Sequence, residues 1–128
     1  MKKIAIVADG WRRYINYAWI SGCRQFIKEK NLDAELYVFY AFGNFSKDEK
    51  YNQGEYNIIT LPDFRQFDGI IVEITNVLKR KYARKIIDTI RKSKVPAVSL
   101  LERIPGLYFA GIDNYSAMKE IVEHLVTV

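Results

Sequence analysis

The sequence predicts an α/β protein: a doubly wound, parallel sheet of five strands in the order 2-1-3-4-5, the flavodoxin-like arrangement. Short, continuously apolar runs alternate with segments whose apolar residues recur at helical spacing, which is typical of strands covered by helices on both faces. The 128 residues are 49% hydrophobic and 27% charged, which fits one globular lobe spanning residues 1–128. Right-handed crossovers leave few other topologies.

The first half of the chain contains two predicted strands and one predicted helix. Lys3–Ala8 is almost entirely apolar and predicts the first buried strand. A polar and aromatic loop over residues 10–14 leads to an amphipathic helix that ends near Asn31. Glu35–Phe42 is rich in tyrosine, phenylalanine and valine, which favours a second strand, and we expect a loop over residues 43–53. The apolar positions of the helix are Ala18, Trp19, Gly22, Cys23, Phe26 and Ile27.

The middle of the chain is predicted to form short turns, a strand and a helix. Glu55–Phe67 has weak helix propensity and contains Pro62, so we expect one or two short turns there. Ile70–Ile74 predicts the third buried strand. One apolar stripe then predicts a third helix; it consists of Leu78, Tyr82, Ile86 and Ile90.

The last third is predicted to form two strands and a final helix. Pro96–Leu101 predicts the fourth strand and Leu107–Ile112 a short fifth one. Asp113 or Asn114 is a suitable N-cap for the last helix. We expect that helix to pack through an inner face of Met118, Ile121, Val122 and Leu125.

The predicted ligand site lies beyond the carboxyl ends of the strands, where the strand order reverses between the first and third strands. Aromatic faces with a few fixed polar groups suit a sugar-like or other small polar ligand. An alternative is that Asp9 only caps the first helix and that Trp11 packs on a partner lobe. The candidate ligand-binding residues are Asp9, Trp11, Tyr14, Asn16, Glu73, Asn76, Glu102 and Arg103.

The sequence offers no pattern for catalysis, metal binding or a cofactor. Cys23 and His124 are single residues far apart, so we expect no metal site and a small core role for the cysteine. No Gly-x-Gly-x-x-Gly motif and no phosphate-binding loop follows the first strand. A phosphorylation receiver would need an acidic pair after that strand, where Asp9 stands alone. We therefore expect a protein that is not an enzyme and holds no cofactor.

The net charge of +5 is concentrated around the third predicted helix. Because these basic residues surround a stripe that must face the sheet, a solvated surface is the favoured interpretation. Nucleic-acid binding through this helix is the weaker alternative, so we expect no direct nucleic-acid contact by this lobe. No apolar run is long enough for a membrane span, and we expect a cytoplasmic protein. The basic residues are Lys79, Arg80, Lys81, Arg84, Lys85, Arg91, Lys92 and Lys94.

Several segments resemble the lactose/galactose-repressor (LacI/GalR) type of periplasmic-binding-protein-like domain. The resemblance is carried by Val95–Leu100, by Phe109–Ala117 with its Gly-Ile-Asp-Asn-Tyr core, and by the Val-Glu-His-Leu of residues 122–125. Phe67–Val72 is similar to the family's third strand and its lead-in. Residues 17–19 and 54–58 look more like a sensory branch, in which the domain often precedes diguanylate cyclase (GGDEF) or kinase modules.

This resemblance implies the N-terminal lobe of a two-lobed domain that closes on a small molecule in a bacterial sensor or transcriptional regulator. The second lobe and the output module would then lie outside these 128 residues. The family's pocket maps onto Asp9, Trp11, Tyr14 and Glu73, whereas its Asp-Arg pair after the fourth strand is replaced here by Glu102 and Arg103. The alternative is a stand-alone flavodoxin-like signalling or interaction domain.

Self-association is also expected, because a single lobe leaves open the surface that would meet its other half. Regulators of the LacI/GalR type are usually dimers, so the resemblance implies a homodimer. The aromatic residues that we expect to be exposed are Phe42, Phe45 and Tyr108.

Overall fold

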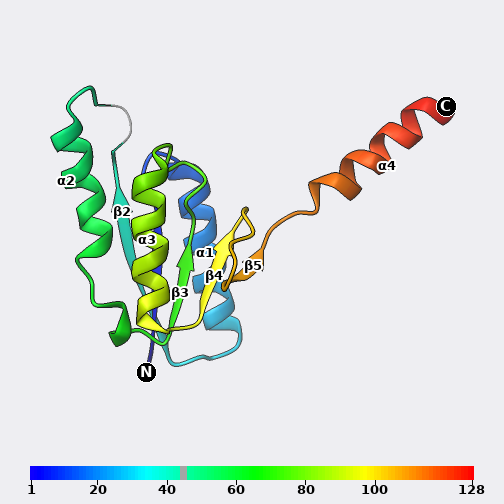
Figure 1. Cartoon of the computed structure of the whole chain (residues 1–128). Coiled ribbons are helices and arrows are strands. Elements are labelled where there is room, and N and C mark those ends of the chain that lie inside the picture. Colours follow the sequence, from blue (N-terminus) through cyan, green and yellow to red (C-terminus); the bar gives the residue numbers. More distant parts are fainter. Residues whose placement is uncertain (44–45) are drawn as a thin grey trace.

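The computed structural model describes residues 1–43 and 46–128 and contains one all-parallel sheet (Figure 1). The strand order is β2-β1-β3-β4-β5, so the predicted fold class and strand order are confirmed. The strands are β1 (Lys2–Asp9), β2 (Ala34–Ala41), β3 (Gly69–Val72), β4 (Ala97–Leu100) and β5 (Tyr108–Ala110).

The register of the central strands brings their carboxyl ends to one edge of the sheet. Val7 of β1 pairs with Phe39 of β2 on one side and with Val72 of β3 on the other. The backbone N–H of Glu73 donates to the carbonyl of Val7 (2.9 Å) and extends the β1–β3 ladder by one residue. The side chains that follow β1 and β3 therefore emerge next to each other at this edge, which we call the carboxyl edge.

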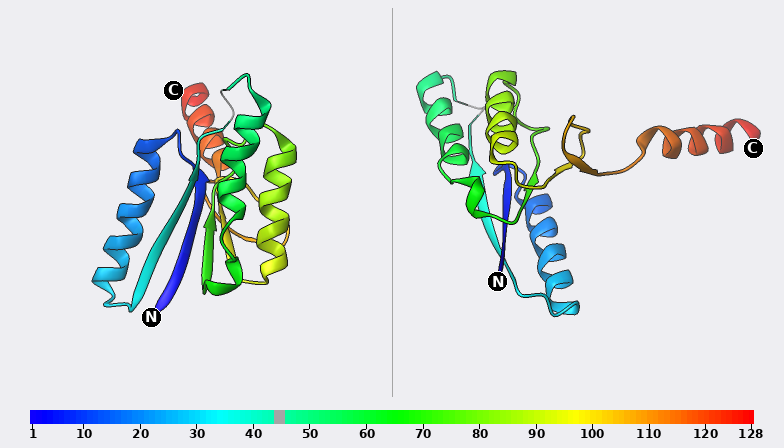
Figure 2. Two further views of the ribbon diagram at one scale, coloured as in Figure 1. Left: turned by 90° about the vertical axis from the view of Figure 1, so that its left-hand side faces the viewer. Right: turned by 60° about the horizontal axis from the view of Figure 1, so that its bottom comes forward.

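Helices cover the two faces of the sheet unequally (Figure 2). Helices α2 and α3 lie on one face, and α1 lies alone on the other. The most deeply buried side chains belong to the α2 and α3 side, among them Ile59, Ile86 and Ile90. The helices are α1 (Arg13–Glu29), α2 (Glu49–Thr60), α3 (Arg80–Ser93) and α4 (Asn114–Thr127), with a 3₁₀ turn at Phe64–Gln66.

The sheet face beside α1 is only partly covered. Asn16 is the one buried residue of α1, and Cys23 is half-buried rather than part of the core. A hollow of about 760 Å³ remains between α1 and the sheet. Because its lining is mostly apolar, this face exposes hydrophobic surface to solvent; the lining includes Ile4, Phe26, Ile71, Val98 and Tyr108.

Helix α2 corrects parts of two predictions: the loop over residues 43–53, of which 44 and 45 lie outside the described residues, and the short turns over 55–67. The 3₁₀ turn at Phe64–Gln66 is a short turn of the kind predicted. A continuous helix runs from Glu49 to Thr60. The Asp48 carboxylate caps it by accepting the backbone N–H groups of Lys50 (2.9 Å) and Tyr51 (3.4 Å). Tyr56 and Ile59 are buried on its inner side, so tertiary packing outweighs the weak local propensity. Pro62 lies beyond the end of the helix and does not interrupt it.

The ends of α1 and α3 also differ from the predicted ones. Helix α1 already begins at Arg13, which places Tyr14 in its first turn. Helix α3 begins at Arg80, so Leu78 precedes the helix, is exposed and does not belong to the buried stripe. The rest of that stripe, Tyr82, Ile86 and Ile90, is buried as predicted.

Helix α4 corrects the predicted packing of the last helix. It projects away from the sheet, and every one of its residues is exposed (Figure 1). The predicted N-cap is confirmed, since the Asp113 carboxylate accepts the backbone N–H of Ser116 (3.1 Å). The predicted inner face, which we call the α4 stripe, is 51–69% exposed; it consists of Met118, Ile121, Val122 and Leu125.

The aromatic residues predicted to be exposed have different outcomes. Tyr108 is exposed, as predicted. Phe42 is half-buried, because the ring of Trp11 packs edge-to-face against it at a centroid distance of 5.5 Å. Phe45 lies outside the described residues. None of the helices among the described residues combines the length and apolarity that a membrane span requires.

Candidate functional site

Asp9 is buried at the end of β1 and organises the first loop of the carboxyl edge. Its Oδ1 accepts the backbone N–H of Trp11 (2.9 Å), which fixes the turn between β1 and α1. Burial raises the pKa of this carboxyl, the hydrogen bond from Trp11 opposes the rise, and the neighbouring Glu73 carboxylate adds to it. Asp9 is thus predicted correctly as a residue of this edge, but it lies below the surface.

Glu73 follows β3 directly and is buried next to the loop after β1. Its Oε1 accepts the backbone N–H of Thr75 (2.5 Å) and also the Thr75 hydroxyl. These bonds hold the loop between β3 and α3 against the sheet. Glu73, like Asp9, therefore shapes the edge from below.

Asn16 links α1 to the end of β1. Its Nδ2 donates to the carbonyl of Asp9 (2.8 Å), whereas its Oδ1 has no hydrogen-bond partner among the described residues. The buried Tyr56 hydroxyl from α2 is likewise without a partner in the described part of the chain. Burial raises the pKa of Tyr56, and the Asp9 carboxylate raises it further, so the two groups are neighbours. Asn16 and Tyr56 therefore bring two buried polar atoms to this edge that the described protein groups leave unsatisfied.

Trp11 and Tyr14 provide the exposed aromatic surface of the edge. Trp11 is 47% exposed, and its Nε1 donates to the carbonyl of Gly43 (2.9 Å), which fixes the ring at the end of β2. Tyr14 is 88% exposed at the start of α1 and contacts little of the lobe. Both rings therefore present apolar surface on which a ligand or a partner could pack.

The remaining predicted residues lie in two loops further along the same edge. Asn76 is half-buried between β3 and α3. Glu102 and Arg103 are exposed between β4 and β5, and the Arg103 guanidinium lies over the ring of Phe109 at 4.2 Å from its centroid. The structure thus places all eight predicted residues at or near the carboxyl edge.

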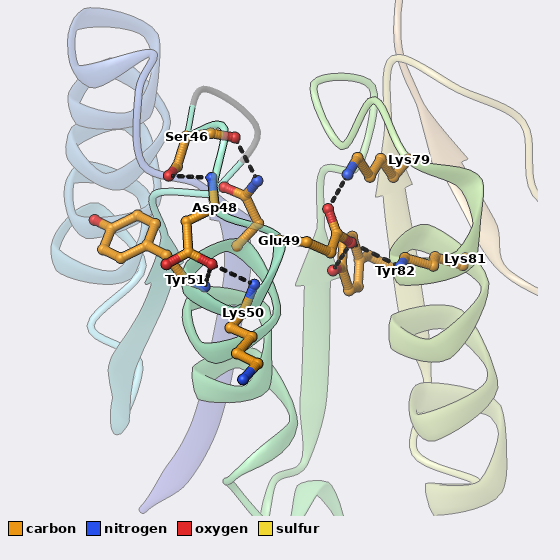
Figure 3. A network of polar contacts seen from close by, with 9 residues as sticks. Ser46, Asp48, Glu49, Lys50, Tyr51, Lys79, Lys81 and Tyr82 are labelled. Carbon is orange, nitrogen blue, oxygen red and sulfur yellow. Dashed lines mark hydrogen bonds and ion pairs between the residues drawn. The ribbon is translucent and has the colours of Figure 1, made fainter.

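An ion-pair cluster between α2 and α3 was not predicted (Figure 3). Glu49, in the first turn of α2, pairs with Lys79 and with Lys81 (2.7 Å), and it accepts the Tyr82 hydroxyl (2.5 Å). These three donors lower the pKa of Glu49 to about 2. The cluster uses Lys79 and Lys81, two of the basic residues at the start of α3, to join the two helices.

Glu49 and Tyr56 were missed because the helix that carries them was not predicted. With α2 recognised, their seven-residue spacing, about two turns, would have placed both on one face of that helix. Their partners come from α3 and β1, which no local pattern reveals.

The carboxyl edge combines a buried framework with an exposed aromatic and charged surface. Buried acids and an amide hold the loops in place, and aromatic rings and charged side chains face outward. Over residues 1–43 and 46–128, no group of three or more histidine, cysteine, aspartate or glutamate side chains is placed to hold a metal ion. Comparison of the sequence with protein-family models and with curated proteins finds no match.

Proposed function

We propose that the chain is the first lobe of a two-lobed, small-molecule-binding domain of the LacI/GalR type, part of a bacterial sensor or transcriptional regulator. The observation that carries this proposal is the position of α4. It starts after β5, at the carboxyl edge, and leaves the lobe with an apolar stripe that the lobe does not cover.

An unsupported helix of this length needs a partner. With 14 residues α4 is about 21 Å long, and isolated helices shorter than roughly 12–15 residues are marginal in water. Most helical stability in proteins comes from packing an amphipathic face. A second lobe that takes up the α4 stripe would supply this packing and would be anchored next to the ligand site.

The surface of the carboxyl edge supports the same arrangement. The loops of this edge and the first turn of α1 expose large apolar side chains, namely Trp11, Tyr14, Leu78 and Leu101. A second lobe above them would remove this surface from water, and a ligand between the lobes would stack on the two aromatic rings. The hydrogen bonds of Asp9 and Trp11 hold the loop between β1 and α1 in one conformation. Closure of the two lobes would therefore lose little conformational entropy in this loop.

The proposal is tested on the natural reading frame that contains these 128 residues. We expect a second α/β lobe to follow Val128, and a panel of monosaccharides and other small polar metabolites to contain a ligand that raises the melting temperature. A ligand at 100 times its Kd adds about 2.7 kcal/mol of stability. Tyr14→Ala should abolish this shift, because Tyr14 is an exposed ring at the edge.

The matched control is Phe26→Ala, an exposed aromatic residue in the last turn of the same helix. Phe26 lies 12 residues from Tyr14, about 18 Å along the helix axis, and is expected to leave ligand binding unchanged. A reading frame without a second lobe would overturn the proposal. Equal effects of the two substitutions on binding would remove the carboxyl edge as the site.

A further inference from the structure

A groove of about 440 Å³ lies between α3 and the segment that joins β4 to β5. Its charged lining is dominated by arginines, with four guanidinium groups against the two carboxylates of Asp88 and Glu102, a net charge of +2. Its apolar lining includes Ile74, Ile87 and Ile104. We call this the arginine groove; its arginines are Arg80, Arg84, Arg91 and Arg103.

The arginines come from both walls of the groove. Arg80, Arg84 and Arg91 lie four and seven residues apart on α3, which places them on one stripe of the helix. Arg103 comes from the facing segment. A ligand between the walls would therefore meet positive charge on two sides.

Two of these arginines fix the shape of the groove. Arg91 Nη2 donates to the carbonyl of Pro105 (2.6 Å), which joins the two walls, and its Nη1 lies 3.8 Å from Asp88 Oδ1. The Arg103 guanidinium is held over the Phe109 ring. The groove is thus formed before any ligand arrives, which lowers the cost of binding.

The other two arginines are available to a ligand. Among the described residues, no carboxylate forms an ion pair with Arg80 or Arg84, and both are exposed. Like charges four residues apart on a helix repel each other, so an anion placed between them would be stabilising. A guanidinium group also binds phosphate and carboxylate oxygens bidentately.

We propose that the arginine groove binds a small organic anion, with its phosphate or carboxylate group on Arg80 and Arg84 and its apolar body on Ile87 and Ile104. The volume lies within the range of about 300–1,000 Å³ that is usual for small-molecule sites. The groove shares Glu102 and Arg103 with the candidate site, but α3 contributes six of its fourteen lining residues, more than either loop. It therefore goes beyond the proposed function and does not require a second lobe.

The test is a titration of the whole chain with phenyl phosphate at low salt. Binding is monitored through the isoleucine methyl signals in NMR spectra. We expect saturable binding that shifts the signals of Ile87 and Ile104 and weakens as sodium chloride is added. Benzoate, the carboxylate arm, should bind at the same place, and neutral phenol should not bind. Arg84→Gln should weaken phenyl phosphate binding about tenfold, the loss of one charge-assisted contact.

The matched control is Lys92→Gln, which removes the same charge from the same helix at a position outside the groove. It should change the Kd less than twofold. Equal weakening by both variants would show attraction to the net charge alone and would overturn the proposal, as would shifts that never saturate. Unchanged methyl and amide signals elsewhere in the Arg84→Gln spectrum show that this variant is folded.

The same titration separates this proposal from the proposed function. Phenyl phosphate in the arginine groove should leave the tryptophan fluorescence unchanged, because neither Trp11 nor Trp19 lines the groove. Binding here without any second lobe would support the groove and leave the two-lobed proposal to its own test. No methyl shift at saturating phenyl phosphate would refute the groove alone.

Discussion

The exposed α4 stripe leads to a quantitative prediction about the stability of the lobe. Met118, Ile121 and Leu125 lie on α4 and are 51–69% exposed. Replacing all three by serine in this chain should change its free energy of unfolding by less than about 1.5 kcal/mol, since a single surface substitution is usually worth less than about 0.5 kcal/mol. The reason is that the lobe buries none of these side chains.

The size of the alternative effect makes the test decisive. If the three side chains packed into the hollow beside α1, each would contribute about 1.5–3 kcal/mol of burial free energy, and their loss would cost at least about 4 kcal/mol. Ile90, a fully buried residue of α3, provides the internal standard for the loss of a buried side chain. Ile90→Ala should cost about 2–5 kcal/mol, because it removes buried methylene groups and leaves a cavity.

Urea unfolding followed by tryptophan fluorescence measures both variants. The fluorescence comes from Trp11 and Trp19, which belong to the lobe and not to α4. We expect the triple serine variant to keep the midpoint of the unmodified chain and Ile90→Ala to lower it clearly. A triple variant as unstable as Ile90→Ala would refute the detached position of α4 and, with it, the main support for a second lobe.

Three further measurements test other features of the lobe. The first is the pH dependence of stability. Because the pKa of Asp9 is raised in the folded state, the contribution of this carboxyl to the free energy of unfolding is complete below its ordinary pKa of 3.8 and declines as the pH rises through the folded-state pKa. Asp9→Asn should remove this decline. The pKa of Glu49 is lowered from 4.5 to about 2, so its contribution to stability is lost as the pH falls through this range, and Glu49→Gln should remove that loss. Urea midpoints measured between pH 2 and 7 test both variants. A variant whose midpoint depends on pH as in the unmodified chain would contradict its prediction. Second, Gly10→Ala places a Cβ 2.4 Å from the Phe42 ring and should lower the free energy of unfolding by about 1–3 kcal/mol. The Cβ of Gly54→Ala in α2 meets no atom within 4 Å, and this substitution should raise the free energy of unfolding by about 0.5–1 kcal/mol. Thermal unfolding that shows a loss of stability for both variants would contradict this packing. Third, self-association stays a prediction, and sedimentation that shows only monomer at high concentration would remove it.

The fold was predictable because its main signals are local. The apolar runs of β1 and β3 and the stripe of Tyr82, Ile86 and Ile90 depend only on residues near each other in the sequence. Helix α2 was missed because its stability comes from outside the segment. Its buried Tyr56 stacks on Tyr82 of α3, with ring centroids 4.6 Å apart, and a segment with weak intrinsic propensity becomes helical through such contacts.

The position of the candidate site in the fold was predictable, but the burial of its individual side chains was not. Strand order alone places the residues after β1 and β3 at one edge, and Asp9 and Glu73 are found there. Which of them reach the surface depends on the loops that fold over them. The Trp11 amide bonds to Asp9 and the Thr75 hydroxyl to Glu73, so both acids are buried while the Trp11 ring is half-exposed.

The buried acids and the detached helix are best explained together. Burial of the Asp9 carboxyl raises its pKa, and the neighbouring Glu73 carboxylate adds to the rise, so a charged Asp9 at this position is a cost to the folded lobe. An apolar surface on a detached helix adds a second cost. A chain under selection for stability alone would replace Asp9 and Glu73 with smaller neutral residues and would fold α4 onto the uncovered face beside α1. Both costs occur at the carboxyl edge, where the strand order reverses and where a ligand and a second lobe would bind. Their shared location supports the proposal that a ligand and a second lobe bind at this edge.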